Sequence, residues 1–203
     1  MKKLFTFIIL TIGFTVSAQI ATSGTTNSGT NASAIGYQTS ATNTVSTAMG
    51  RETLASGVTS TAMGYQTSAT NTASTAIGNN STASGITSTA IGNNSTASGE
   101  TSIAMGFETE ATHSASLAMG YQTSSTEGAS SAMGFKTTAS GFGSTSIGYE
   151  TVASGNSSTA MGWLTTANGK ASIAMGKSTI ASDFGSLVIG QYNLSGSTVT
   201  NSA

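Results

Sequence analysis

Ser60-Thr61-Ala62-Met63-Gly64 is one copy of a five-residue segment that returns every 14 residues along this chain of 203 residues. A fixed period held over many copies without an insertion is typical of a solenoid, in which each repeat forms one coil stacked on the next. We number repeat positions from the final glycine, which is position 0. It recurs twelve times, at Gly36, Gly50, Gly64, Gly78, Gly92, Gly106, Gly120, Gly134, Gly148, Gly162, Gly176 and Gly190.

Two short segments of each repeat have the composition of β-strands. Positions −4 to −1 read Ser, mostly Thr, Ala, then Ile or Met, and positions +3 to +5 read Thr, a variable residue and Ala, as in Thr67-Ser68-Ala69. Both are rich in β-branched residues and bounded by turn residues. Because 14 residues hold two strands and two turns but no pair of helices, the sequence predicts an all-β parallel roll of about twelve coils.

Two repeat positions carry turn signals. Position 0 is always glycine, which predicts either a turn or a close backbone approach where a Cβ would clash. Position +7 holds residue types that tolerate positive φ, so we expect a left-handed turn there. Its occupants are glycine in six copies (Gly57, Gly85, Gly99, Gly141, Gly155, Gly169) and Asn43, Asn71, His113 or Asp183 in four others.

Side-chain alternation sorts the faces of the predicted strands. The alanines at positions −2 and +5 and the threonine at +3 point inward, whereas position −1 points outward. Coils stacked at about 4.8 Å place the outward residues in a column roughly 55–60 Å tall. This column consists of Ile35, Met49, Met63, Ile77, Ile91, Met105, Met119, Met133, Ile147, Met161, Met175 and Ile189.

Such a column exceeds the apolar patch that a soluble monomer normally exposes. At roughly 1.5–3 kcal/mol per fully buried side chain, covering it offers at most some tens of kcal/mol. An interior of alanine buries little by comparison, so a lone chain is expected to be marginal. We therefore expect an oligomer interface here, and a rotational trimer is the simplest closed arrangement, although periodicity alone does not select three chains over two.

Composition restricts the kinds of ligand that the chain can bind and the cellular compartment in which it is expected to function. Charged residues make up 6 %, and cysteine and proline are absent, so neither disulfides nor thiolate metal sites are expected. Residues 1–18 combine Lys2-Lys3, a short apolar run and Val16-Ser17-Ala18, which predicts a cleaved signal peptide and export. The remainder carries four basic and seven acidic residues, which disfavours nucleic acid as a partner. No later segment is expected to span a membrane.

The domain organisation follows from the array. Residues 19–31 are either a lead-in or a degenerate first coil, residues 32–198 form the repeat array, and residues 199–203 are a truncated tail.

The repeat resembles the head repeats of YadA-like trimeric autotransporter adhesins. The motifs that carry this are Ser88-Thr89-Ala90-Ile91-Gly92 and Ser95-Thr96-Ala97-Ser98-Gly99, and the resemblance covers about 32–190. It implies a left-handed parallel β-roll that trimerises through its inner strands on the surface of a Gram-negative bacterium and binds host matrix, cells or itself. Two departures stand out: position −3 is mostly threonine instead of valine, and no copy has the Asn-Ser-Val-Ala-Ile-Gly form associated with collagen binding.

Residues with catalytic potential do not form a recognisable constellation. His113, the only histidine, occupies the predicted turn position, and Glu108 and Glu110 replace polar residues of other coils. Neither a serine triad nor a phosphate-binding loop nor a calcium-binding nonapeptide is found. We therefore expect no enzyme activity, no cofactor and no metal.

Aromatic residues recur at position +1, just after the glycine. Five fall in consecutive coils: Phe107, Tyr121, Phe135, Tyr149 and Trp163. They are interpreted either as ladder stacking from coil to coil or as an adhesive edge.

These observations favour a non-enzymatic adhesin head. The alternative is a soluble β-solenoid that binds ice or crystal surfaces through threonine arrays, since position +3 is threonine in nine of twelve coils. That alternative is disfavoured because position +3 is expected to point inward.

Overall fold

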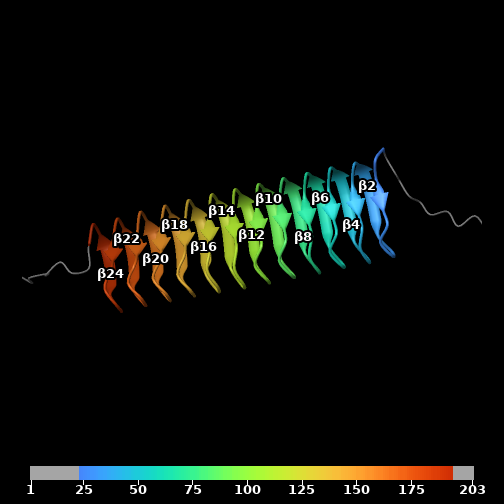
Figure 1. Ribbon diagram of the computed structural model, residues 1–203. Coiled ribbons are helices and arrows are strands. Elements are labelled where there is room, and N and C mark those ends of the chain that lie inside the picture. The colour runs from blue at the N-terminus through green and yellow to red at the C-terminus, as the bar shows by residue number, and fades with distance from the viewer. Residues whose placement is uncertain (1–22, 194–203) are drawn as a thin grey trace, which may run out of the picture.

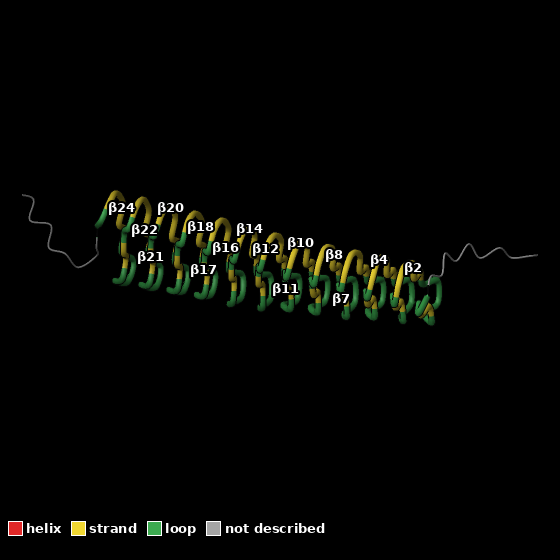
Figure 2. Tube along the Cα trace, turned by 90° about the horizontal axis from the view of Figure 1, so that it is seen from above, coloured by secondary structure: helices red, strands yellow, loops and turns green. Residues whose placement is uncertain are grey.

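The computed structural model describes residues 23–193, which form one parallel β-solenoid (Figure 1). Each complete coil contributes one long and one short strand, and these stack into two twelve-stranded sheets. Viewed from above, the strands are joined by turns into narrow coils (Figure 2). Residues 23–193 contain no helix, and hence no membrane-spanning helix. The all-β roll of about twelve coils predicted from the period is confirmed.

The strands alternate between the two sheets along the chain. The long strands have five residues each: β2 (Ser33–Tyr37), β4 (Thr47–Arg51), β6 (Thr61–Tyr65), β8 (Thr75–Asn79), β10 (Thr89–Asn93), β12 (Ile103–Phe107), β14 (Leu117–Tyr121), β16 (Ser131–Phe135), β18 (Thr145–Tyr149), β20 (Thr159–Trp163), β22 (Ile173–Lys177) and β24 (Leu187–Gln191). The short strands have two residues each: β1 (Thr26–Asn27), β3 (Ser40–Ala41), β5 (Leu54–Ala55), β7 (Ser68–Ala69), β9 (Thr82–Ala83), β11 (Thr96–Ala97), β13 (Glu110–Ala111), β15 (Ser124–Ser125), β17 (Thr138–Ala139), β19 (Val152–Ala153), β21 (Thr166–Ala167) and β23 (Ile180–Ala181).

The ends of the array depart from full coils. Strand β1 pairs in parallel with β3, so the lead-in contributes a partial first coil from residue 23 onward. The expected signal peptide, residues 1–18, and the expected tail, residues 199–203, lie outside the described residues.

Neighbouring coils are in strict register. Ala62 pairs with Ala76, and Gly64 pairs with Gly78, between β6 and β8. The same pairing of identical repeat positions holds along both sheets, so one 14-residue period corresponds to one coil. Because the backbone groups of the strands bond to the coil above or below, the parallel ladders run along the solenoid axis.

The interior is only two side chains wide. Alanines at positions −2 and +5 are fully buried in nearly every coil, as are the serines at −4 and the threonines at +3. The predicted alanine interior and the inward threonines are therefore confirmed. A core of such small residues buries little apolar area per coil.

Several interior threonines have no hydrogen-bonding partner for their hydroxyl within the described residues. Seven are in this state: Thr39, Thr53, Thr67, Thr123, Thr137, Thr165 and Thr179. By contrast, Thr151 Oγ1 lies 2.7 Å from Ser146 Oγ. An unpaired buried hydroxyl costs free energy, so these threonines weaken the interior they fill.

The position-0 glycines lie inside the long strands and not in a turn. Gly92 is the fourth residue of β10 and has φ of +130°. A Cβ on it would lie 1.9 Å from the carbonyl oxygen of Gly106. Of the two roles expected for this glycine, the structure shows the close backbone approach; the same strand placement and positive φ recur from Gly36 to Gly190.

The left-handed turn residues are at positions +2 and +9, so their predicted place at position +7 was wrong. Gln66 has φ of 52° and Thr59 has φ of 55°, whereas Gly57 is outside the left-handed region. These conformations let the backbone N–H of Thr59 donate to Thr44 O at 2.9 Å and that of Gln66 donate to Arg51 O at 2.9 Å, in the preceding coil. Coil stacking therefore overrides the preference of β-branched residues for negative φ.

Glycine at position +7 satisfies a different constraint. A Cβ on Gly85 would lie 1.9 Å from Gly99 O, so the next coil leaves no room for a side chain there. The serine at position −4 closes the same turn, since Ser60 Oγ donates to Gly57 O at 2.7 Å and its N–H donates to that oxygen at 3.2 Å. This double contact accounts for the recurrence of serine at that position.

The unpaired hydroxyls lead to a stability prediction. Replacing Thr137 by valine removes an unsatisfied buried hydroxyl while nearly keeping the side chain's volume, so T137V is expected to raise the free energy of unfolding by about 1 kcal/mol. The measurement is urea denaturation followed by circular dichroism. T151V is the matched control at the same repeat position. It is expected to lower the free energy of unfolding because it leaves the Ser146 hydroxyl without this hydrogen-bonding partner. Equal effects of the two substitutions would contradict this account.

Candidate adhesive surfaces

The outer face of the long-strand sheet carries one continuous file of isoleucine and methionine. Met63 pairs with Ile77, and the same register links every position −1 residue from Ile35 to Ile189. Most of these side chains are half-buried in the single chain, while Met119 is 36 % exposed and Ile189 58 %. The predicted single file therefore exists, and its role as a trimer interface remains a prediction.

The opposite outer face is polar. The outward position of the short strands, +4, and the position just after each strand, +6, are mostly serine and threonine, as at Ser68 in β7, Thr82 in β9 and Thr96 in β11. Only one broad face of the roll thus presents a continuous apolar file.

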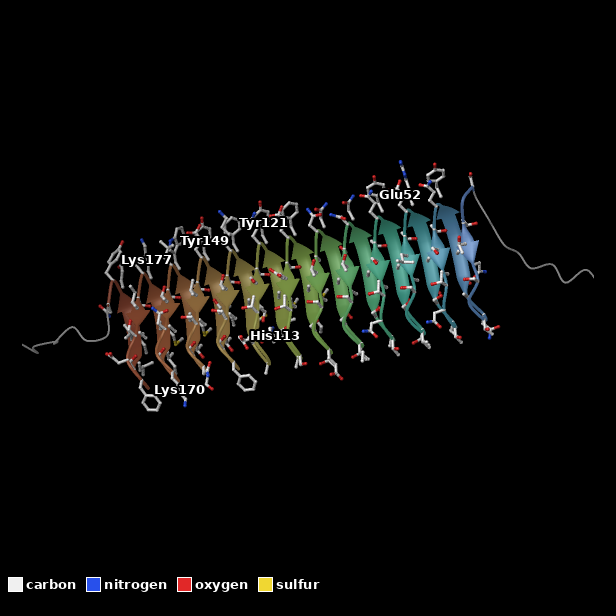
Figure 3. All side chains as sticks on the ribbon, in the orientation of Figure 1. Glu52, His113, Tyr121, Tyr149, Lys170 and Lys177 are labelled. Carbon is white, nitrogen blue, oxygen red and sulfur yellow. The ribbon has the colours of Figure 1, made fainter. Side chains whose placement is uncertain are left out.

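One edge of the roll carries the aromatic side chains of position +1. The rings of Phe107, Tyr121, Phe135 and Tyr149 stack with centroids 4.9 Å apart and planes within 6° of one another, and Trp163 follows at 4.7 Å with a 30° tilt. Tyr121, Tyr149 and Lys177 project from the same edge, opposite the edge that bears His113 and Lys170 (Figure 3). The interpretation as ladder stacking is confirmed, and we call these five rings the aromatic ladder.

Cations lie against rings along this edge. The Arg51 guanidinium lies 5.6 Å from the Tyr37 ring centroid and 5.4 Å from that of Tyr65, one coil to either side. Lys136 Nζ lies 5.4 Å from the Phe135 ring, and Lys177 Nζ lies 6.0 Å from the Trp163 ring. The Arg51 and Lys177 contacts extend coil-to-coil side-chain stacking beyond the aromatic ladder, whereas the Lys136 contact lies within one coil.

The residues considered for catalysis do not come together. His113 Nδ1 lies 3.2 Å from Thr112 Oγ1, and Glu108 accepts a hydrogen bond from Gln122 Nε2 at 2.6 Å. Glu110 belongs to β13 of the short-strand sheet and is exposed. Within residues 23–193, no group of three or more His, Cys, Asp or Glu side chains is placed to hold a metal ion.

Comparison with known families agrees with this geometry. The family description "YadA head domain repeat" matches residues 28–53, 55–81, 83–109, 139–165 and 167–193, together more than half of the chain. The chain belongs to the YadA head family. This membership indicates an adhesin-like role. A search among curated proteins returned no match to the chain.

The YadA head repeats continue through the unmatched interval 110–138. Strand β15 pairs on both sides with the same register as elsewhere. In this interval Ser125 replaces the core alanine, and its Oγ lies 2.6 Å from Ser130 Oγ. With Ser146 nearby, this substitution separates the alanine core into one cluster ending at Ala118 and another beginning at Ala153.

Polar ladders at position +2 were missed by the sequence analysis, which noted only that Glu108 replaces polar residues of other coils there. Gln66 Nε2 donates to Glu52 Oε2 at 2.8 Å, and Asn80 Nδ2 donates to Asn94 Oδ1 at 2.7 Å. The donor and acceptor of each pair are 14 residues apart. Complementary side chains at equal repeat positions were therefore the available signal.

The charges of this edge shift two tyrosine pKa values in opposite directions. The pKa of Tyr149 is raised above its ordinary value, first by the negative charge of Glu150, then by desolvation and by its hydrogen bond with Glu150. The pKa of Tyr192 is lowered, first by a hydrogen bond from Gln191 and then by the positive charge of Lys177 and a hydrogen bond with it.

These shifts can be tested with a single substitution. E150Q removes the charge that disfavours the Tyr149 phenolate, so the pKa of Tyr149 is expected to fall while that of Tyr192 stays low. NMR titration of ¹³Cζ-labelled tyrosine resolves the five residues individually. K177Q is the complementary variant and is expected to raise the pKa of Tyr192 only. A Tyr149 titration unchanged by E150Q would show that Glu150 does not act on it.

Proposed function

We propose that this chain is an exported adhesin head that forms a homotrimer through the Ile/Met file and attaches a bacterium to a surface, to host matrix or to other cells, or mediates self-association. The observation that carries the proposal is the unbroken position −1 file on the outer face of a YadA head roll. The signal peptide, the Gram-negative cell-surface or secreted location and the trimer are parts of this proposal.

The energetics of the single chain support assembly. Its interior consists of alanine, serine and threonine, several with unsatisfied hydroxyls, so intrachain burial contributes little. The largest apolar side chains of the long-strand sheet lie instead on its outer face, where covering them would contribute up to some tens of kcal/mol over the file. A closed rotational arrangement covers the same face of every subunit at once.

Trimerisation through this face directs the remaining surfaces outward. The polar short-strand face is then available to ligands, repeated along each roll and again in each subunit. Repetition suits adhesion because several weak contacts to one surface combine into high avidity.

The structure removes the main support for the ice-binding alternative. The threonines at position +3 are buried, so they cannot meet a crystal surface. Those at position −3 are interrupted by Ile103, Leu117, Ile173 and Leu187. No further observation favours that function.

The trimer interface leads to a sedimentation prediction. The exported chain is expected to sediment as a trimer, and M119E is expected to sediment as a monomer, because three carboxylates would be buried without partners near one axis. T96E is the matched control on the polar face, where the equivalent position natively holds Glu110. A monomeric wild-type chain, or a trimeric M119E variant, would refute the assigned interface.

Adhesion is tested separately with the same proteins. Surface plasmon resonance on an immobilised extracellular-matrix extract is expected to show retention of the wild-type chain and of T96E, and roughly 100-fold weaker apparent affinity for M119E, because the monomer loses avidity. An albumin-coated surface is the blank. Equal retention on matrix and albumin, with the trimer intact, would refute matrix adhesion but would not contradict the proposed trimer interface.

A further inference from the structure

The alanine core of the roll is interrupted at one place. Every seventh residue from position 34 to position 181 fills the interior, and all of these residues are alanine except Ser125 and Ser146. The two serines divide the buried alanines into one cluster that ends at Ala118 and another that begins at Ala153. The roll therefore contains two apolar cores in series along its axis.

The hydrogen bonds of these two serines do not join one coil to the next. Ser125 Oγ lies 2.6 Å from Ser130 Oγ, and Ser146 Oγ lies 2.7 Å from Thr151 Oγ1. The partners are five residues apart, less than one 14-residue period, so each pair lies within a single coil. Contacts between neighbouring repeats are what make a solenoid unfold as one unit. The serines therefore remove apolar contact along the axis and add bonds only within coils.

The turns of the same segment also lose a contact between coils. Where position +7 is glycine, its N–H donates to an alanine carbonyl of the next coil, as from Gly99 to Ala111 at 3.4 Å. His113 and Glu127 hold this position in two consecutive coils, and neither donates such a bond within residues 23–193. Between positions 29 and 183, no other two consecutive coils lack glycine at +7. Coupling between coils is thus weakened in the core and in the turns alike.

The rings of the aromatic ladder supply contact between coils over this same segment. The two coils that carry the core serines, and the coil between them, bear the three central rings Tyr121, Phe135 and Tyr149. Phe107 and Trp163 lie in the first coils on either side where both core positions are alanine again. Each stacked pair joins residues 14 apart and hence neighbouring coils. The stack begins and ends where the alanine core is complete.

We propose that the aromatic ladder couples the two apolar cores across the interruption at Ser125 and Ser146, so that the roll unfolds as one cooperative unit. Stacked aromatic rings attract one another beyond the area that they bury, and here they do so along the axis. The stacking joins rings of one chain, so it is the same whether this edge faces solvent or another subunit. The coupling is independent of the trimer interface and of adhesion.

Two probes of urea unfolding test this coupling in the exported chain. Trp163, the only tryptophan, lies beside the core that begins at Ala153, so its fluorescence reports on the C-terminal core. Circular dichroism reports on the whole roll. Transitions that coincide by both probes indicate a single cooperative unit. They are expected to coincide for the wild-type chain, and separate transitions there would overturn the proposal.

The double variant Tyr121→Asn with Phe135→Asn breaks the aromatic ladder, using the residue that the chain itself has at this position in Asn79. It keeps the contact between Tyr149 and Trp163, so the fluorescence probe retains its neighbouring ring. Its two transitions are expected to separate by at least about 0.5 M urea. The fluorescence transition is expected to come first, because the C-terminal core is the shorter of the two. Coincident transitions in this variant would refute the coupling.

A matched control tests whether the position of the rings matters. Tyr37→Asn with Tyr65→Asn changes the same repeat position beside an uninterrupted part of the core. Its transitions are expected to coincide, as in the wild-type chain. Equal separation in this control and in the ladder variant would contradict the proposal.

Restoring the apolar core tests whether the serines cause the interruption. Ser125→Ala, Ser146→Ala and Thr151→Val together make these core positions apolar, while Ser130 Oγ keeps its hydrogen bond to the carbonyl oxygen of Glu127. Added to the broken ladder, these three substitutions are expected to bring the two transitions back together. Transitions that stay separate would show that the serines do not divide the roll.

Protein concentration distinguishes coupling within a chain from contacts between subunits. The separation of the two transitions is expected to stay the same as the concentration is raised, because the stacked rings belong to one chain. A separation that disappears at high concentration would assign the effect to subunit contacts and overturn the proposal. Circular dichroism without urea checks that each variant keeps its β-sheet signal. If the ladder variant loses that signal, Tyr121→Asn alone provides the same comparison.

Discussion

Backbone hydrogen bonding between successive coils, which places identical repeat positions side by side, is the constraint on which this molecule depends. Each coil must superimpose on its neighbour at a single spacing, so every position is repeated in a file along the axis. The glycine file shows how tight this stacking is, because the carbonyl of Gly106 occupies the space where a Cβ of Gly92 would lie. The backbone at Thr59 shows how strong it is, since a β-branched residue adopts a left-handed conformation to keep its bond to the preceding coil.

This constraint explains what the sequence could and could not predict. The period and the alternation of small and larger side chains predicted the strands, the alanine interior and the single file of Met63 and Ile77, because these follow from pattern alone. Position +7 was assigned wrongly because glycine there was attributed to its φ. Gly85 is required instead by the lack of space beside the next coil. Such a contact between coils leaves no local signal in the sequence.

The candidate surfaces also include some features that the sequence predicted and others that it could not. Recurrence at position +1 predicted that rings such as Tyr121 would share one edge, but not that their planes would be parallel with their edges outward. The pairing of Gln66 with Glu52 required knowing that residues 14 apart are neighbours in space. The proposed partner of the Ile/Met file is another chain, so no feature of a single sequence or a single roll describes the geometry of that contact.

The direction of the hydrogen bonds also determines how the roll responds to a mechanical load. When the two ends of the solenoid are pulled apart along its axis, tension acts on the bonds of the outermost coil first, since each ladder bond points along the axis. The roll then peels open one coil at a time instead of shearing as a whole. Each rupture releases one 14-residue period, roughly 46–50 Å of extended chain, so stretching dissipates work in many small steps.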